Sequence, residues 1–167
     1  MGKIKLILTF IILGLVNVVQ AQLADSWFGH YKGDLEIINV KGEKTVVAME
    51  LKIENRTDSL YAFTIVYGED SMRQVRDYAL IPKSINQYLL DEKNGIELPM
   101  TLFDNRLISV FEVQGNLLQV SYSLVGDNII FRTTSARKSK VSGGTDEIPE
   151  VQGYITTVDQ SAVLGRL

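Results

Sequence analysis

The sequence predicts an all-β protein, namely an antiparallel up-and-down β-barrel of about 8–10 strands. Apolar and polar residues alternate over short segments, turn residues separate most of these segments, and patterns typical of helices are scarce. Connections of roughly two to five residues favour a barrel over a two-sheet sandwich, because a Greek-key sandwich needs at least one long crossover. No βαβ spacing is present, which argues against a parallel sheet.

The strands can be placed from this alternation. Its clearest example spans 45–54, where Val47, Met49, Leu51 and Ile53 share one face of an extended segment. A first strand is expected within 27–35, and further strands are expected at 59–67, 72–81, 87–92, 96–103, 106–113, 117–125, 128–135 and 152–159.

The C-terminal part is expected to be less regular. Residues 137–150 read as a long polar connection, which would carry the last strand across to pair with the first and close the sheet. A short helical segment is expected near 161–164.

Residues 1–21 have the order of a secretory signal peptide. Lys3 and Lys5 precede an almost entirely apolar run over 6–19, and Ala21 ends a small-residue cleavage signal. The run is too short for a stable membrane span, which needs about 20 apolar residues. We therefore expect cleavage near Ala21, one barrel domain over 22–167, no membrane span after cleavage, and a periplasmic or secreted protein.

Composition limits the partners and the source of stability. The chain has 167 residues, a net charge of −3 and no cysteine. The basic cluster at 137–140 reads as a solvated loop, so nucleic-acid binding is not expected, because phosphate contacts need clustered Lys and Arg. An exported domain without disulfides must rely on apolar burial and a continuous hydrogen-bonded ladder, and closing the sheet supplies both.

The stretch from Gly29 to Leu35 suggests a family. Its Gly29-x-Tyr31-x-Gly33 pattern resembles the Gly-x-Trp-x-Gly first-strand motif of lipocalin-like (calycin) β-barrels, with Tyr31 at the Trp position. The two glycines are expected where another backbone approaches closely or the strand coils sharply. The resemblance implies a small lipophilic ligand in the barrel mouth. It also implies an arginine from the last barrel strand packed over the first-strand aromatic ring, for which Arg132 is the candidate.

Residues typical of enzymes are few. His30 is the only histidine, so neither a metal site nor a nucleophile–base pair is predicted, and no cofactor is expected. Asn94-Gly95 predicts a two-residue type I′ hairpin turn. Asp91, Glu92 and Glu97 flank this turn and are interpreted as solvating groups. The protein is therefore not expected to be an enzyme.

Two hypotheses about function remain open, and a third, a hydrolase or isomerase that uses carboxylates at the barrel mouth, is disfavoured because the sequence shows no acid–base geometry. In the first, the exported barrel binds a small hydrophobic ligand in its interior. In the second, side chains fill the interior, and the barrel is a structural or interaction module that docks to an envelope partner or to itself. The residues proposed to contact a ligand are Trp27, Tyr31, Tyr61, Phe63, Tyr88, Phe111, Tyr122, Phe131 and Arg132.

Overall fold

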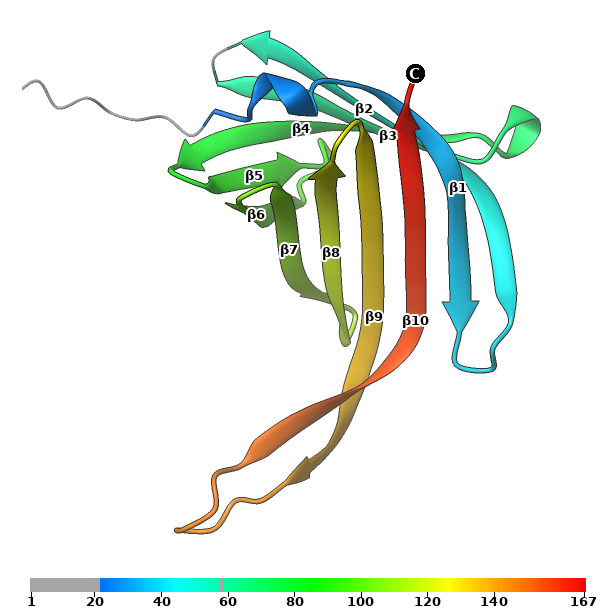
Figure 1. Cartoon of the computed structure of the whole chain (residues 1–167). Coiled ribbons are helices and arrows are strands. Elements are labelled where there is room, and N and C mark those ends of the chain that lie inside the picture. Colours follow the sequence, from blue (N-terminus) through cyan, green and yellow to red (C-terminus); the bar gives the residue numbers. More distant parts are fainter. Residues whose placement is uncertain (1–21, 58) are drawn as a thin grey trace, which may run out of the picture.

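The computed structural model describes residues 22–57 and 59–167, which form a ten-stranded closed barrel (Figure 1). Consecutive strands are hydrogen-bonded neighbours, and β1 pairs with β10 to close the sheet. The predicted all-β, antiparallel up-and-down barrel is thus confirmed. The predicted signal peptide and its cleavage site at residues 1–21 lie outside the described residues.

The strands follow one another with short connections, apart from two 3₁₀ helices. These helices are η1 (Asp25–Trp27), before the first strand, and η2 (Asp70–Met72), between β3 and β4. The strands are β1 (Gly29–Asn39), β2 (Lys44–Thr57), β3 (Leu60–Tyr67), β4 (Gln74–Ser84), β5 (Gln87–Asp91), β6 (Glu97–Phe103), β7 (Arg106–Val113), β8 (Asn116–Val125), β9 (Asn128–Ser142) and β10 (Val151–Arg166).

The C-terminal region is more regular than the sequence predicted. The connection expected over 137–150 is confined to 143–150, because β9 and β10 continue their ladder beyond the barrel wall and Ser142 still pairs with Val151. The helix expected near 161–164 is wrong. These residues belong to β10, where Ala162 pairs with Leu35 of β1.

The ends of β9 and β10 form a two-stranded arm that projects from the barrel (Figure 1). We define this arm as residues 138–156. Pairing of β8 with β9 ends at Arg137, and pairing of β1 with β10 ends at Val158. Beyond those points the two strands pair with each other, with irregularities between Gln152 and Tyr154 and after Thr156.

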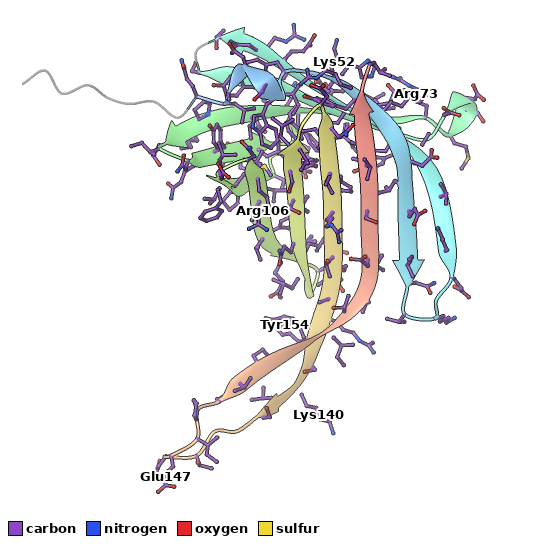
Figure 2. All side chains as sticks on the ribbon, in the orientation of Figure 1. Lys52, Arg73, Arg106, Lys140, Glu147 and Tyr154 are labelled. Carbon is purple, nitrogen blue, oxygen red and sulfur yellow. The ribbon has the colours of Figure 1, made fainter. Side chains whose placement is uncertain are left out.

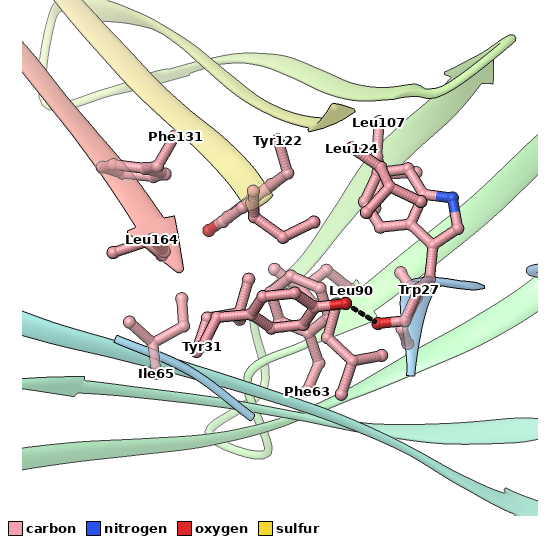
Figure 3. Close-up of a cluster of buried hydrophobic side chains, with 14 of the residues drawn as sticks. Trp27, Tyr31, Phe63, Ile65, Leu90, Leu107, Tyr122, Leu124, Phe131 and Leu164 are labelled. Atoms are coloured by element: carbon pink, nitrogen blue, oxygen red, sulfur yellow. Dashed lines mark hydrogen bonds between the residues drawn. The ribbon is translucent and has the colours of Figure 1, made fainter. Parts of the chain in front are cut away.

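One end of the barrel is closed by the segment that precedes β1. Trp27 of η1 is 1% exposed, and it packs with Tyr31 and Phe63 in the buried cluster that fills this end (Figure 3). The hydroxyl of Tyr31 donates a hydrogen bond to the carbonyl of Trp27 at 3.0 Å. The backbone amide of Leu23 donates to the hydroxyl of Tyr61, so the chain ahead of the barrel is tied to its wall.

The structure shows why β1 needs a glycine at position 33. A β carbon at this position would overlap the carbonyl oxygen of Val163 on the neighbouring strand β10. This point lies between the pairs Lys32–Gly165 and Leu35–Ala162, and the backbone of β10 is so close to Gly33 here that only a hydrogen atom fits in place of a side chain. The close backbone approach expected at Gly33 is therefore observed.

Candidate functional site

The interior is divided along the barrel axis into a packed half and a hollow half. On β2, Met49, Leu51 and Ile53 point inward and are fully buried, whereas Val47, nearer the other end, is only half-buried. The same change occurs on β1, from buried Leu35 to half-buried Ile37. The end at Trp27 is thus a solid plug, and the end at Val47 and Ile37 is the mouth.

A cavity of ≈ 220 Å³ lies in the mouth half. Its wall is mostly apolar, and five aromatic side chains from five strands contribute to it. The aromatic lining residues are Tyr67, Tyr78, Phe111, Tyr122 and Phe131. Apolar walls with a few placed polar groups are the usual composition of small-molecule sites.

A second cavity of ≈ 290 Å³ adjoins the first, because Tyr67 and Gln160 line both. It lies under η2, which contributes Met72, and is bounded on β1 by Leu35 and Ile37. Each cavity alone is slightly smaller than the roughly 300–1,000 Å³ typical of ligand pockets, and the two together fall within that range.

Tyrosine hydroxyls and one carboxylate are the main polar groups of the first cavity. Burial raises the pKa of Tyr67 to about 12, and burial also raises the pKa of Tyr122 well above its ordinary value. The pKa of Tyr78 is raised chiefly by burial and then by the nearby carboxylate of Glu92. All three phenols are therefore neutral at physiological pH. Glu92 is the one formally charged residue in the lining of either cavity.

The wall of the first cavity includes the weakest seam of the sheet. β6 and β7 share only three paired positions, from Thr101–Ile108 to Phe103–Arg106. Beyond them the hydroxyl of Ser109 donates to the carbonyl of Pro99 at 2.7 Å and so bridges the two strands. Pro99 has no backbone N–H to donate to a ladder, which agrees with its position beside this seam.

The cation over the first-strand aromatic ring is Arg166, and the prediction of Arg132 for this role was wrong. The Arg166 guanidinium carbon lies 4.8 Å from the centre of the Tyr31 ring, and Nη2 donates to the Tyr31 hydroxyl at 2.7 Å. Nη1 and Nη2 also donate to the carbonyls of Phe28 and Ser26. Arg132 follows inward-facing Phe131 on β9, so its side chain is exposed on the outer surface. Arg166 was missed because β10 was expected to end before it.

The other residues predicted to contact a ligand fall into two groups. Phe111, Tyr122 and Phe131 line the first cavity. The remaining five lie in the plugged half, where they are at most 2% exposed; they are Trp27, Tyr31, Tyr61, Phe63 and Tyr88.

Several cavity residues were not among those proposed to contact a ligand. Tyr67 shares the inward face of Tyr61, Phe63 and Ile65 on β3, as the alternation in the sequence indicates, but it was left out of the proposed set. Gln160 was missed because its strand was expected to end at 159. Glu92 was interpreted as a solvating group, yet it is half-buried and lines the cavity.

The histidine and its charged neighbours lie outside the cavities. His30 Nε2 lies 3.0 Å from Glu50 Oε2 on the outer surface, where Lys32 also pairs with Glu50. Within residues 22–57 and 59–167, no group of three or more His, Asp or Glu side chains is arranged to hold a metal ion. Over the same ranges, no helix has the length and apolar character needed to cross a membrane.

Comparisons with known proteins agree on the fold. No family model matches the sequence, and no curated protein matches it significantly. The S-type phycobiliprotein lyase CPES from Guillardia theta is similar in structure, with a TM-score of 0.60 and 6% identity over 85% of this chain and 89% of that chain. A protein of unknown function from the DUF3598 family of Nostoc punctiforme has a TM-score of 0.61 and 13% identity over 89% of this chain. The chain spans about half of that protein's length (51%).

These similarities define the class of the fold. The chain has the fold of a ten-stranded lipocalin-like barrel, which is the fold that the Gly29-x-Tyr31-x-Gly33 pattern suggested. At such low identities the similarity concerns the fold alone.

Proposed function

We propose that the protein binds a small, largely apolar molecule in the mouth half of its barrel. The observation that carries this proposal is the hollow, aromatic-lined cavity above a solid plug. A protein selected only for stability would fill this space, because an empty apolar cavity costs about 1 kcal/mol or more per missing methyl-sized group. The lipocalin-like fold supports the proposal as a scaffold.

A cavity-filling variant tests this function. Val120 lines the first cavity and is half-buried, so Val120→Trp would occupy the space that the ligand needs. Val163 lies on the outer surface and is 63% exposed, so Val163→Trp is the matched control. We expect the neutral fluorescent probe N-phenyl-1-naphthylamine to bind saturably to the wild type and to Val163→Trp, and at least about tenfold more weakly to Val120→Trp. Equal binding to all three proteins would contradict the proposal.

The proposed location is the periplasm or the exterior of the cell, as the signal-peptide pattern of residues 1–21 indicates. An expressed full-length chain should be recovered with Gln22 as its first residue. N-terminal sequencing or intact mass measurement would test this, and a chain that retains residues 1–21 in the cytoplasm would contradict it.

A second candidate function, self-association, is favoured by the arm. The arm carries exposed apolar side chains on a ribbon of two strands, and such a ribbon is marginally stable by itself. Figure 2 shows that Lys140, Glu147 and Tyr154 lie on the arm, outside the barrel wall. The exposed apolar residues are Val141, Ile148, Val151, Tyr154 and Ile155.

The charges of the arm fit a second copy of this chain. Its base is basic, with Lys138 and Lys140, and its tip is acidic, with Asp146, Glu147 and Glu150. Two arms related by a two-fold axis and lying antiparallel would place each base against the partner's tip. Sedimentation velocity should then detect a dimer that high salt weakens and that Lys140→Glu disrupts. A monomer at all concentrations up to about 100 µM, well above a micromolar dissociation constant, would exclude this function.

A further inference from the structure

The charge of the cavity lining suggests which ligands it selects. Among the residues that line the two adjoining cavities there is no lysine or arginine, and the single carboxylate is that of Glu92. Transferring a ligand carboxylate into such a space would leave it without a cationic partner, which is strongly unfavourable in an apolar site. The site is therefore poorly suited to fatty acids and other organic anions.

Glu92 is positioned to act as the charged contact. It follows β5, is half-buried, and approaches Tyr78 closely enough to raise the pKa of that phenol. Its Oε2 accepts a hydrogen bond from Nδ2 of Asn94 at 3.2 Å, which orients the carboxylate. None of the ion pairs within 4.0 Å in the described part of the chain involves Glu92. Its charge is thus available to a ligand.

The aromatic rings add a second attraction for positive charge. The faces of Tyr and Phe rings are electronegative, and several such rings around one space form the arrangement that binds ammonium groups. Besides burial, Tyr78 raises the pKa of Tyr67, and both Tyr67 and Tyr78 raise the pKa of Tyr122. All three side chains line the first cavity together with Glu92, so their phenol groups lie near one another and near that carboxylate. The remaining apolar wall, with Leu98 and Val120, would hold the uncharged part of the molecule.

We infer that the ligand is an organic cation, an amine or ammonium group on a compact apolar body, whose charge is bound by Glu92 and the surrounding tyrosine rings. This inference rests on the proposed ligand-binding function and adds the chemical class of the ligand.

Arg76 is the residue that would favour an anionic ligand over a cationic one. It lies on β4 on the same face as Tyr78, and its charge acts on the pKa values of Tyr67 and Tyr78. Its side chain is exposed, and it is not part of the lining of either cavity. An anion bound at the mouth would use Arg76, whereas a cation bound in the cavity would use Glu92, so the two residues separate the alternatives.

Three probes of one shape test the inference: 1-naphthylmethylamine, 1-naphthylmethanol and 1-naphthoate, with dissociation constants measured by calorimetry at pH 7. We expect the amine to bind at least about tenfold more tightly than the alcohol, and the carboxylate to bind most weakly. Glu92→Gln should weaken the amine about tenfold and leave the alcohol within about twofold. Glu97→Gln, an exposed carboxylate at the same turn, is the matched control and should change neither.

The outcomes separate the inference from the proposed function. If 1-naphthoate binds most tightly and Arg76→Gln weakens it, the charge preference is overturned while the ligand-binding function stands. If the amine binds equally well to the wild type and to Glu92→Gln, the assigned role of Glu92 is wrong. If the neutral alcohol and both charged probes fail to bind the wild type, the proposed function fails, and the inference fails with it. A thermal melt of each variant would confirm that it is folded.

Discussion

Replacement of Gly33 by alanine should destabilise the barrel at its closure. The added methyl group would overlap the carbonyl oxygen of Val163, a backbone atom, and would also approach the side chain of Leu164. The strand β10 cannot withdraw without disturbing the pairs Lys32–Gly165 and Leu35–Ala162. Overpacking against backbone atoms lowers the free energy of unfolding by about 1–3 kcal/mol. We expect a loss of about 2–3 kcal/mol here, because neither strand can shift without breaking its pairing with the other.

The matched control is Gly165 on β10, which pairs with Lys32, the residue before Gly33. A β carbon there would stand 3.6 Å from Asn128 Oδ1 and 4.0 Å from the carbonyl oxygen of Lys32, which are ordinary contacts. Gly165→Ala should therefore leave stability unchanged or raise it by up to about 1 kcal/mol, because alanine restricts the unfolded chain. Urea unfolding followed by Trp27 fluorescence measures both variants. If Gly33→Ala unfolds at the wild-type urea concentration, the close approach does not constrain β1.

Three further predictions concern other contacts. Arg166→Gln removes the cation from the Tyr31 ring together with the donors to two backbone carbonyls. The melting temperature should fall and the free energy of unfolding should drop by about 1–3 kcal/mol, and Arg166→Lys should not restore it. Ser109→Ala removes the hydroxyl that bridges to Pro99, so it should lower the free energy of unfolding by about 0.5–1.5 kcal/mol and speed amide hydrogen exchange along β6 and β7. Unchanged exchange would contradict the bridging role. Burial raises the pKa of Tyr67 from its ordinary value of 10.0 to about 12 in the folded protein. The buried neutral phenol therefore makes its full contribution to the free energy of unfolding below pH 10, and this contribution is lost as pH rises through about 12. Urea unfolding at pH 9 and pH 11.5 should show this loss, and Tyr67→Phe should reduce it.

Much of the fold could be predicted because inward-facing and outward-facing residues alternate along the strands of the barrel wall. Strands such as β2 and β8 bury one face more than the other, so alternation predicts their inward residues, although β2 extends to Thr57, beyond its predicted end at 54. Gly33 was interpretable for a similar reason, since glycine within a strand needs a local cause.

The errors occurred where neighbouring strands, and not local pattern, decide the structure. Residues 161–164 are strand because β10 pairs with both β1 and β9, and sequence alone gave no sign of this double pairing. The turn at Asn94-Gly95 is a further example. Positive φ occurs at Lys93 and Gly95, and the Asn94 side chain accepts the amide of Ile96, so the turn is longer than a two-residue hairpin.

The candidate site was only partly predictable, because alternation tells inside from outside but not plug from mouth. Tyr61 and Tyr67 share one face of β3, and yet Tyr61 is bonded into the plug whereas Tyr67 lines the cavity. Position along the barrel axis follows from the stagger of all ten strands, which no single segment encodes. The same limitation explains the choice of five residues that lie in the plug.

The division into plug and mouth also accounts for how a chain without disulfides can keep part of its interior hollow. Closure of β1 on β10 and the cluster around Trp27 concentrate the apolar burial at one end, where the large side chains interlock. Pairing of β6 with β7 stops beyond Thr101–Ile108, and this unpaired stretch and the unfilled cavity lie together at the other end. Local stability in proteins is uneven, and binding regions belong to its less stable part. The arrangement therefore places the energetic cost of the unfilled cavity where it least affects the closure of the sheet, and the proposed ligand would enter the less stable mouth half.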